Sequence, residues 1–310
     1  MNPACYSAFV HPRPALLRAV LCMAVLLPLT SVAQDQCPPE GTDMSSLQLL
    51  KQQGFILDDV SARETLALGL LGCLSSPEPK LRDGIAYEAL TEWLRSDQLA
   101  PAVRAQLRDQ LYAMLKEEDV NGFRRSFAAL VLSEVARTDR IAAWMSPGER
   151  VLMVRAATEF LRSISDYRGY DDVEGWRHAV AHGSDWLLQL ASNPAVERAQ
   201  VDQILAALAT QVVPESAHAY VHGEPGRLAR PVLSIARRGL LGEADWTAWF
   251  NGLPARIGDP AQAYADSGWL ARRHDLLAFL AGLYMEADQS GDAQIHALKA
   301  PVVVALKMVP

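Results

Sequence analysis

The chain has 310 residues, a formal net charge of −7 and an apolar fraction of 50%, which is typical of a globular protein with a large core. An acidic chain is a poor candidate for nucleic-acid binding, because that binding depends on neutralising phosphates with lysine and arginine. The chain also lacks the basic, amphipathic character of a peripheral membrane binder.

Residues 1–33 have the pattern of a secretory signal peptide. Two arginines are followed by an apolar run at 19–29 and by small residues at 31–33 that suit cleavage. The apolar run is much shorter than the about 20 residues that a membrane-spanning helix needs. We therefore expect residues 34–310 to be a periplasmic or secreted protein with no stable membrane anchor after cleavage.

Cleavage leaves two cysteines, Cys37 and Cys73, in the mature chain. In an oxidising compartment, an isolated pair predicts a disulfide, which would link the mature N-terminus to an early helix. A loop of this length is worth roughly 3–4 kcal/mol in the chain-entropy model. The alternative is two free thiols, with Cys73 buried among leucines.

Apolar residues recur at helical spacing through nearly the whole chain, and no convincing run alternates with the period of a strand. The segment Ser146-Pro147-Gly148-Glu149 has the cap, proline and glutamate of a helix start. The sequence predicts pairs of helices at 44–53 with 58–74, 79–95 with 101–116, 121–137 with 148–163, 174–191 with 196–212, 226–238 with 243–251, and 269–287 with 294–307.

From the second pair on, successive pairs begin at intervals of roughly 40–55 residues, a rhythm that stacked helical hairpins produce. We predict an all-α fold with one domain over 34–310, built as a HEAT-like or armadillo-like α-solenoid. A closed α/α barrel is the alternative, because spacing alone does not separate the two. The longest break, 213–226, has no low-complexity character and is not interpreted as a linker.

The predicted helix at 174–191 carries the strongest functional signal. With 100° per residue, Trp176 and several aliphatic residues form the face that the helix buries. His178, His182 and Asp185 gather in an arc of about 60° near the opposite side. In a solenoid, this polar stripe would face a groove or water.

These three side chains suit two chemistries. Two imidazoles four residues apart with a carboxylate, His178, His182 and Asp185, could hold a divalent metal such as zinc, manganese or iron. They could instead transfer protons, with Asp185 orienting one histidine. The zinc-protease motif has a glutamate where this chain has Ala179, so a merely hydrogen-bonded or solvated stripe remains the alternative.

Polar and aromatic residues also collect just before this helix. Arg168 and Tyr170 are candidates for contact with a ligand or with a neighbouring helix pair, since binding groups often lie on loops of a rigid scaffold. The aspartates at 171 and 172 are interpreted as helix caps. His218 and His222 repeat the four-residue spacing within the 213–226 break, where we interpret them as loop histidines in water. A metal site shared with the helix would require that loop to fold over it.

Two arginines lie near the start of another predicted helix, in Phe123-Arg124-Arg125-Ser126-Phe127. Positive charge there opposes the helix dipole, so these arginines should meet carboxylates or a ligand anion. An ion pair between helix pairs is the preferred interpretation. No serine-elbow, phosphate-loop or dinucleotide-glycine motif is present in the sequence.

Two stretches, 123–132 and 166–188, resemble a bacterial family known as domain of unknown function 2785. They read Phe-Arg-Arg-Ser-Phe-Ala-Ala-Leu-Val-Leu and Asp-Tyr-Arg-Gly-Tyr followed by Gly-Trp-Arg-His-Ala-Val-Ala-His-Gly-Ser-Asp-Trp-Leu-Leu. A third stretch, 223–230, departs from the family pattern at Pro225 or Gly226, where an acidic residue is expected. The resemblance spans most of residues 45–300 and implies an all-helical fold. It favours as site residues Arg125, Asp166, Arg168, Gly169, Trp176, His178, His182 and Asp185.

Two functions follow as expectations. The first is an uncharacterised exported binding module whose polar groove around 166–189 takes a protein, peptide or small-molecule ligand. Its candidate ligand-binding residues are Arg125, Asp166, Arg168, Tyr170, Trp176, His178, His182 and Asp185. The second is a metal-dependent hydrolase that uses His178, His182 and Asp185. The sequence leaves open whether the protein is an enzyme.

Overall fold

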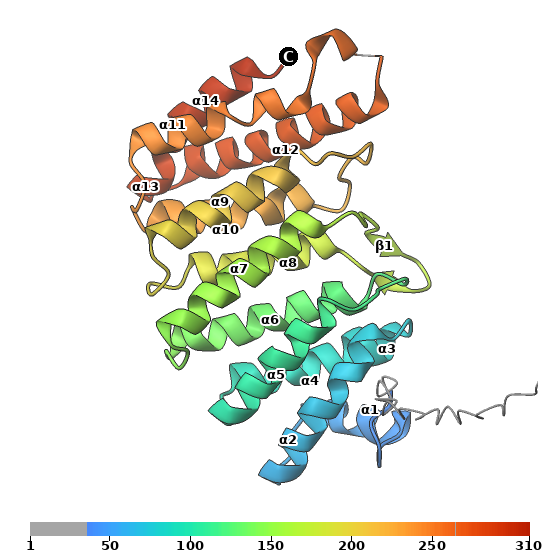
Figure 1. The fold of residues 1–310 in the computed structure, drawn as a ribbon. Helices are drawn as coiled ribbons and strands as arrows, with labels where there is room; N and C mark the ends of the chain where they lie inside the picture. The colour runs from blue at the N-terminus through green and yellow to red at the C-terminus, as the bar shows by residue number, and fades with distance from the viewer. Residues whose placement is uncertain (1–35, 264) are drawn as a thin grey trace, which may run out of the picture. The chain divides into compact units, whose positions relative to one another are not determined.

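The computed structural model describes residues 36–263 and 265–310 (Figure 1). The described chain is mostly helical, which confirms the all-α class. The expected signal peptide at 1–33 lies outside the described residues. Within the described ranges, no helix combines the length and apolar character needed to cross a bilayer.

The helices follow the predicted pairs closely. The α-helices are α1 (Met44–Gln52), α2 (Val60–Gly69), α3 (Pro79–Leu81), α4 (Glu88–Arg95), α5 (Pro101–Met114), α6 (Arg124–Ile141), α7 (Pro147–Ser163), α8 (Ala179–Ala191), α9 (Arg198–Val212), α10 (Glu224–Arg237), α11 (Glu243–Asn251), α12 (Ser267–Gln289), α13 (Ala293–His296) and α14 (Lys299–Met308). The tighter or wider turns are the 3-10 segments η1 (Leu70–Ser75), η3 (Pro254–Ile257) and η4 (Pro260–Gln262), and the π-helical segment η2 (Arg82–Tyr87).

Helix starts follow the predicted chemistry where the sequence carries a cap. At α7, the Ser146 hydroxyl accepts the Glu149 backbone N–H, and the Glu149 carboxylate accepts the Ser146 N–H. This reciprocal capping box satisfies two amide groups that have no partner inside the helix. Pro147 occupies the first helical position, where its missing N–H costs nothing.

Helix α8 lies among four other helices. It packs against α6 and α10, and also contacts α7 and α9 (Figure 1). Gly183 makes this close packing possible, because a Cβ there would lie 3.0 Å from a Leu161 methyl and 3.1 Å from the Phe160 ring. As a result α8 is buried on most of its circumference, and the prediction of a polar stripe facing a groove or water is wrong for His182.

The segment predicted as the first turns of this helix is a small β-hairpin. Strands β1 (Tyr170–Asp171) and β2 (Gly175–Trp176) are antiparallel, with Tyr170 opposite Trp176. Gly175 and His178 have φ angles of +74° and +53°, in the left-handed region that ends or precedes a helix rather than continuing it. The Asp171 carboxylate accepts the N–H groups of Val173 and Glu174, so it caps the hairpin turn and not a helix.

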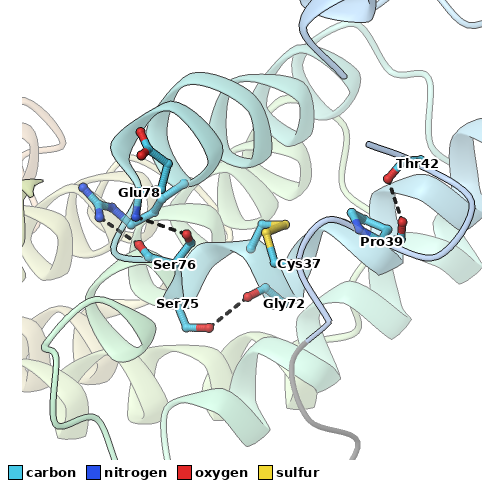
Figure 2. Close-up of a disulfide and its surroundings, with 9 residues drawn as sticks. Cys37, Pro39, Thr42, Gly72, Ser75, Ser76 and Glu78 are labelled. Atoms are coloured by element: carbon cyan, nitrogen blue, oxygen red, sulfur yellow. Dashed lines mark hydrogen bonds between the residues drawn. A yellow bond between two sulfur atoms is a disulfide. The ribbon is translucent and has the colours of Figure 1, made fainter. Parts of the chain in front are cut away.

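The predicted disulfide between Cys37 and Cys73 is present, with an S–S distance of 2.02 Å and a Cα–Cα distance of 5.0 Å. Figure 2 shows Cys37 beside the turn that carries Gly72 and Ser75, where the Ser75 hydroxyl donates to the Gly72 carbonyl. The bond therefore fastens the first described residues to η1, whose Cys73 is fully buried.

Candidate functional site

Four aromatic or imidazole rings meet at the start of α8. Trp176 of β2 and His178, the residue before α8, stack with ring centroids 4.6 Å apart and an interplanar angle of 18°. His222, from the loop before α10, presents its ring edge to both, at 5.7 Å and 6.5 Å. Tyr170 of β1 extends the group, 5.0 Å from Trp176. We call Tyr170, Trp176, His178 and His222 the ring cluster.

The loop histidines are therefore not simply in water as the sequence suggested. His222 approaches the hairpin so closely that a Cβ on Gly169 would lie 1.9 Å from its Cδ2 atom. His218 stacks on Tyr167, with ring centroids 5.6 Å apart. The loop does fold over the start of α8, and Gly169 provides the space for it.

His178 is the most unusual residue of the ring cluster. Its backbone is left-handed, and its buried Nε2 atom has no hydrogen-bond partner among the described residues. This nitrogen lies 3.8 Å from a carboxylate oxygen of Glu224, whose side chain is also buried. Burial lowers the pKa of His178 below its usual value, although the Glu224 charge opposes that shift.

Glu224 is a residue that the sequence did not single out. It is the first residue of α10, after the left-handed Gly223, and its second carboxylate oxygen accepts the His222 backbone N–H at 2.9 Å. A carboxylate is favoured at a helix N-terminus because of the helix dipole. The signal that could have found it is the Gly-Glu-Pro start of α10 directly after His222.

His182 belongs to the core between α6 and α8. The Ser126 hydroxyl donates its proton to the Arg177 carbonyl. His182 Nδ1 therefore donates to the Ser126 hydroxyl oxygen at 2.8 Å and to the Ser126 carbonyl oxygen at 3.2 Å. Phe127 meets the imidazole edge-on at 5.1 Å. Burial lowers the pKa of His182 to about 3, so this imidazole is neutral near pH 7.

The Asp185 carboxylate is directed toward α10 and not toward His178 or His182. Arg227 Nε donates to Asp185 Oδ1 at 3.0 Å and its Nη2 donates to Oδ2, which is a bidentate pair. Burial nevertheless raises the pKa of Asp185. The rings of His178 and His182 are 6.0 Å apart. Over the described ranges, no group of three or more His, Cys, Asp or Glu side chains is arranged to hold a metal ion.

The remaining candidates lie on the loop side of α6. Asp166 and Arg168 form a bidentate pair with each other, and a Cβ on Gly122 would meet the Asp166 carboxylate at 2.4 Å. Arg125 donates to the Ser163 hydroxyl at 2.8 Å. A hollow of about 140 Å³ lies here, lined in part by Arg125, Asp166 and Ala179.

A second set of residues that sequence reasoning missed packs against the hairpin. Two guanidinium groups contact the Phe123 ring, with Arg82 at 3.9 Å and Arg177 at 4.3 Å from its centroid. Both arginines bind Glu174, Arg82 through the backbone carbonyl at 2.7 Å and Arg177 through the carboxylate at 2.6 Å. These contacts join η2, α6 and the hairpin. No local sequence pattern predicts these contacts, because Arg82 and Glu174 are 92 residues apart.

These features define an all-α protein with a ring-lined candidate site where a hairpin and a loop cover the start of one helix. The family model described as "Protein of unknown function (DUF2785)" matches residues 110–285, more than half of the chain, so the chain belongs to this family. The match includes the whole ring cluster. No curated protein and no solved structure matches the chain.

Proposed function

We propose that the protein is exported and acts as a binding module, with a small polar ligand held at the ring cluster. The observation that carries this proposal is His178, a partly buried imidazole in a left-handed conformation whose buried Nε2 atom has no hydrogen-bond partner among the described residues. Strained backbone and unsatisfied buried polar atoms each cost free energy, and both collect at functional sites. A ligand that donates to or accepts from Nε2 would satisfy it.

The surroundings of His178 indicate the ligand's chemistry. Trp176 and Tyr170 are 38% and 51% exposed, so exposed flat rings lie beside the partly buried imidazole and the Glu224 carboxylate. Flat faces next to hydrogen-bonding groups fit a ring that carries both C–H faces and hydroxyls. We infer that the ligand is a sugar.

The helix contacts support a stacked architecture over one domain at 34–310. Helix α6 packs on α8, α8 on α10, α10 on α12 and α12 on α14, while α7 packs on α9. Extensive contacts of this kind join elements that are near one another in the chain, which is typical of helical repeats. We therefore favour the α-solenoid over the closed barrel. The disulfide suits export, since such bonds persist in oxidising compartments.

The metal-dependent hydrolase lacks a comparable supporting observation. Asp185 is held by Arg227, and His182 Nδ1 by Ser126, so the three expected ligands do not converge on one point. The residues present do not fit a divalent metal, and we derive no reaction step from one.

Calorimetric titration of the mature chain with cellobiose and chitobiose tests the proposal. His178→Asn suits the test because asparagine tolerates the left-handed conformation and removes the imidazole. We expect His178→Asn and Trp176→Ala to weaken sugar binding by at least about tenfold. Val173→Ala, in the same hairpin and 83% exposed, should bind like the wild type.

Two results would refute the sugar-binding proposal. One is the absence of any binding of either disaccharide to the wild-type chain. The other is binding that neither His178→Asn nor Trp176→Ala weakens. A short peptide that binds with the same dependence on Trp176 and His178 would keep the site and replace the ligand class.

A further inference from the structure

A second hollow lies away from the ring cluster, among residues of α5, α6 and α7. Its volume is about 450 Å³, within the range of small-molecule sites. Much of its wall is apolar and comes from Leu115, Leu152, Ala156 and Phe160. Leu152 is 58% exposed, so the apolar wall reaches the surface.

The charges around this hollow are mostly positive, and they differ in how they are neutralised. Lys116, Arg125 and Arg155 line it, with Glu159 as the acidic residue. Arg155 is paired with Glu159 at 2.8 Å. The Arg125 guanidinium donates to the Ser163 hydroxyl and is not paired with any described carboxylate, whereas the adjacent Arg124 is paired with Glu117. The salt bridge expected for Arg125 from the sequence is thus not formed.

Two hydrogen-bond donors at this hollow have no partner in the described chain. They are Arg125 Nε and the hydroxyl of Tyr112, both buried. A buried donor without an acceptor costs about 1–3 kcal/mol, so a ligand acceptor here would recover free energy. Because one donor is a guanidinium, the acceptor that fits best is a carboxylate.

We propose that this hollow binds the carboxylate of an amphipathic acid, with Arg125 at the head group and the apolar wall around the tail. Arg125 also lines the smaller hollow beside Asp166, so this residue borders both hollows. This site is separate from the ring cluster and does not depend on the sugar-binding proposal. The ligand class is a medium-chain fatty acid.

Calorimetry with decanoate, decanol and acetate tests this assignment on the full mature chain. Decanoate should bind the wild type, and decanol and acetate should each bind at least about tenfold more weakly, since each lacks one half of the recognised chemistry. Arg125→Gln should weaken decanoate binding by at least about tenfold. Arg162→Gln, an exposed arginine of α7 that does not line the hollow, is the matched control and should bind decanoate like the wild type.

Equal binding of decanol and decanoate would overturn the proposal, as would decanoate binding that survives Arg125→Gln. Circular dichroism and the melting temperature of each unliganded variant separate lost binding from lost folding. Leu152→Asp, at an exposed position of the apolar wall, provides a second variant that should weaken decanoate binding if Arg125→Gln does not fold. Trp176→Ala must leave decanoate binding unchanged, which keeps this result independent of the ring cluster.

Discussion

Replacing Gly169 with alanine should disrupt the contact between the hairpin and the loop before α10. The added Cβ would lie 1.9 Å from His222 Cδ2 and 2.5 Å from its Nε2, far inside van der Waals contact. Either the imidazole leaves the ring cluster or the loop moves. If the ring leaves, its edge contacts with Trp176 and His178 are lost.

The loss of stability can be estimated for each response, whether the His222 ring leaves or the loop moves. Loss of the ring contacts alone is worth about 0.5–1.5 kcal/mol, and inserting a methyl group into a packed site usually costs about 1–3 kcal/mol. We therefore expect Gly169→Ala to lower the free energy of unfolding by about 1–3 kcal/mol. Urea denaturation, followed by circular dichroism, measures this difference. The same variant should weaken binding of the ligand at the ring cluster, since His222 is one of its rings.

A matched glycine and a second-site change sharpen the experiment. Gly226 lies in α10, and a Cβ there meets nothing within 4 Å. Gly226→Ala should therefore be neutral or stabilising by about 0.5–1 kcal/mol, because alanine is the better helix residue. His222→Ala should restore much of the stability lost in Gly169→Ala, since the conflict is with that ring. Equal stability of the two alanine variants, or no recovery on removing His222, would refute the steric argument.

Two further predictions concern pH and the disulfide. The pKa of His182 is about 3 in the folded state against 6.5 in the unfolded state, so the unfolded state takes up the proton first as the pH falls. The free energy of unfolding should therefore decrease below pH 6.5. Urea unfolding should show that the free energy of unfolding is about 2 kcal/mol lower at pH 5 than at pH 7, and that this difference is missing in His182→Gln. Equal decreases in both proteins would contradict the prediction. Reducing the Cys37–Cys73 bond, which closes a separation of 36 residues, should lower the free energy of unfolding by about 3–4 kcal/mol. A reductant should not shift the unfolding midpoint of a Cys37→Ser/Cys73→Ala variant, and a wild-type midpoint equally insensitive to the reductant would contradict the prediction.

Most helices could be predicted because their boundaries depend on neighbouring residues. The segment predicted at 243–251 is α11, and the one predicted at 101–116 is α5 with its last turn shortened. The hairpin could not be predicted in this way. Two-residue strands are too short to show a period, and the apolar spacing of 174–191 continues across them. The left-handed conformations of Gly175 and His178 prevent the helix from beginning earlier, and the sequence does not determine that conformation for a histidine.

The polar residues that the sequence assigned to one exposed stripe have other surroundings in the structure. Periodicity finds residues on a common face, yet it does not say whether water or another helix covers that face. Here neighbouring helices do, through His182 with Ser126, Asp185 with Arg227, and Gln189 with Arg140. The partners are 56, 42 and 49 residues away, close to the interval between successive helix pairs. In a chain of paired helices, a polar stripe should therefore be checked for complementary residues one pair away before it is assigned to a groove. By that test the residues that keep a functional claim are His178, which has no such partner for Nε2, and Arg125, whose charge no carboxylate meets among the described residues.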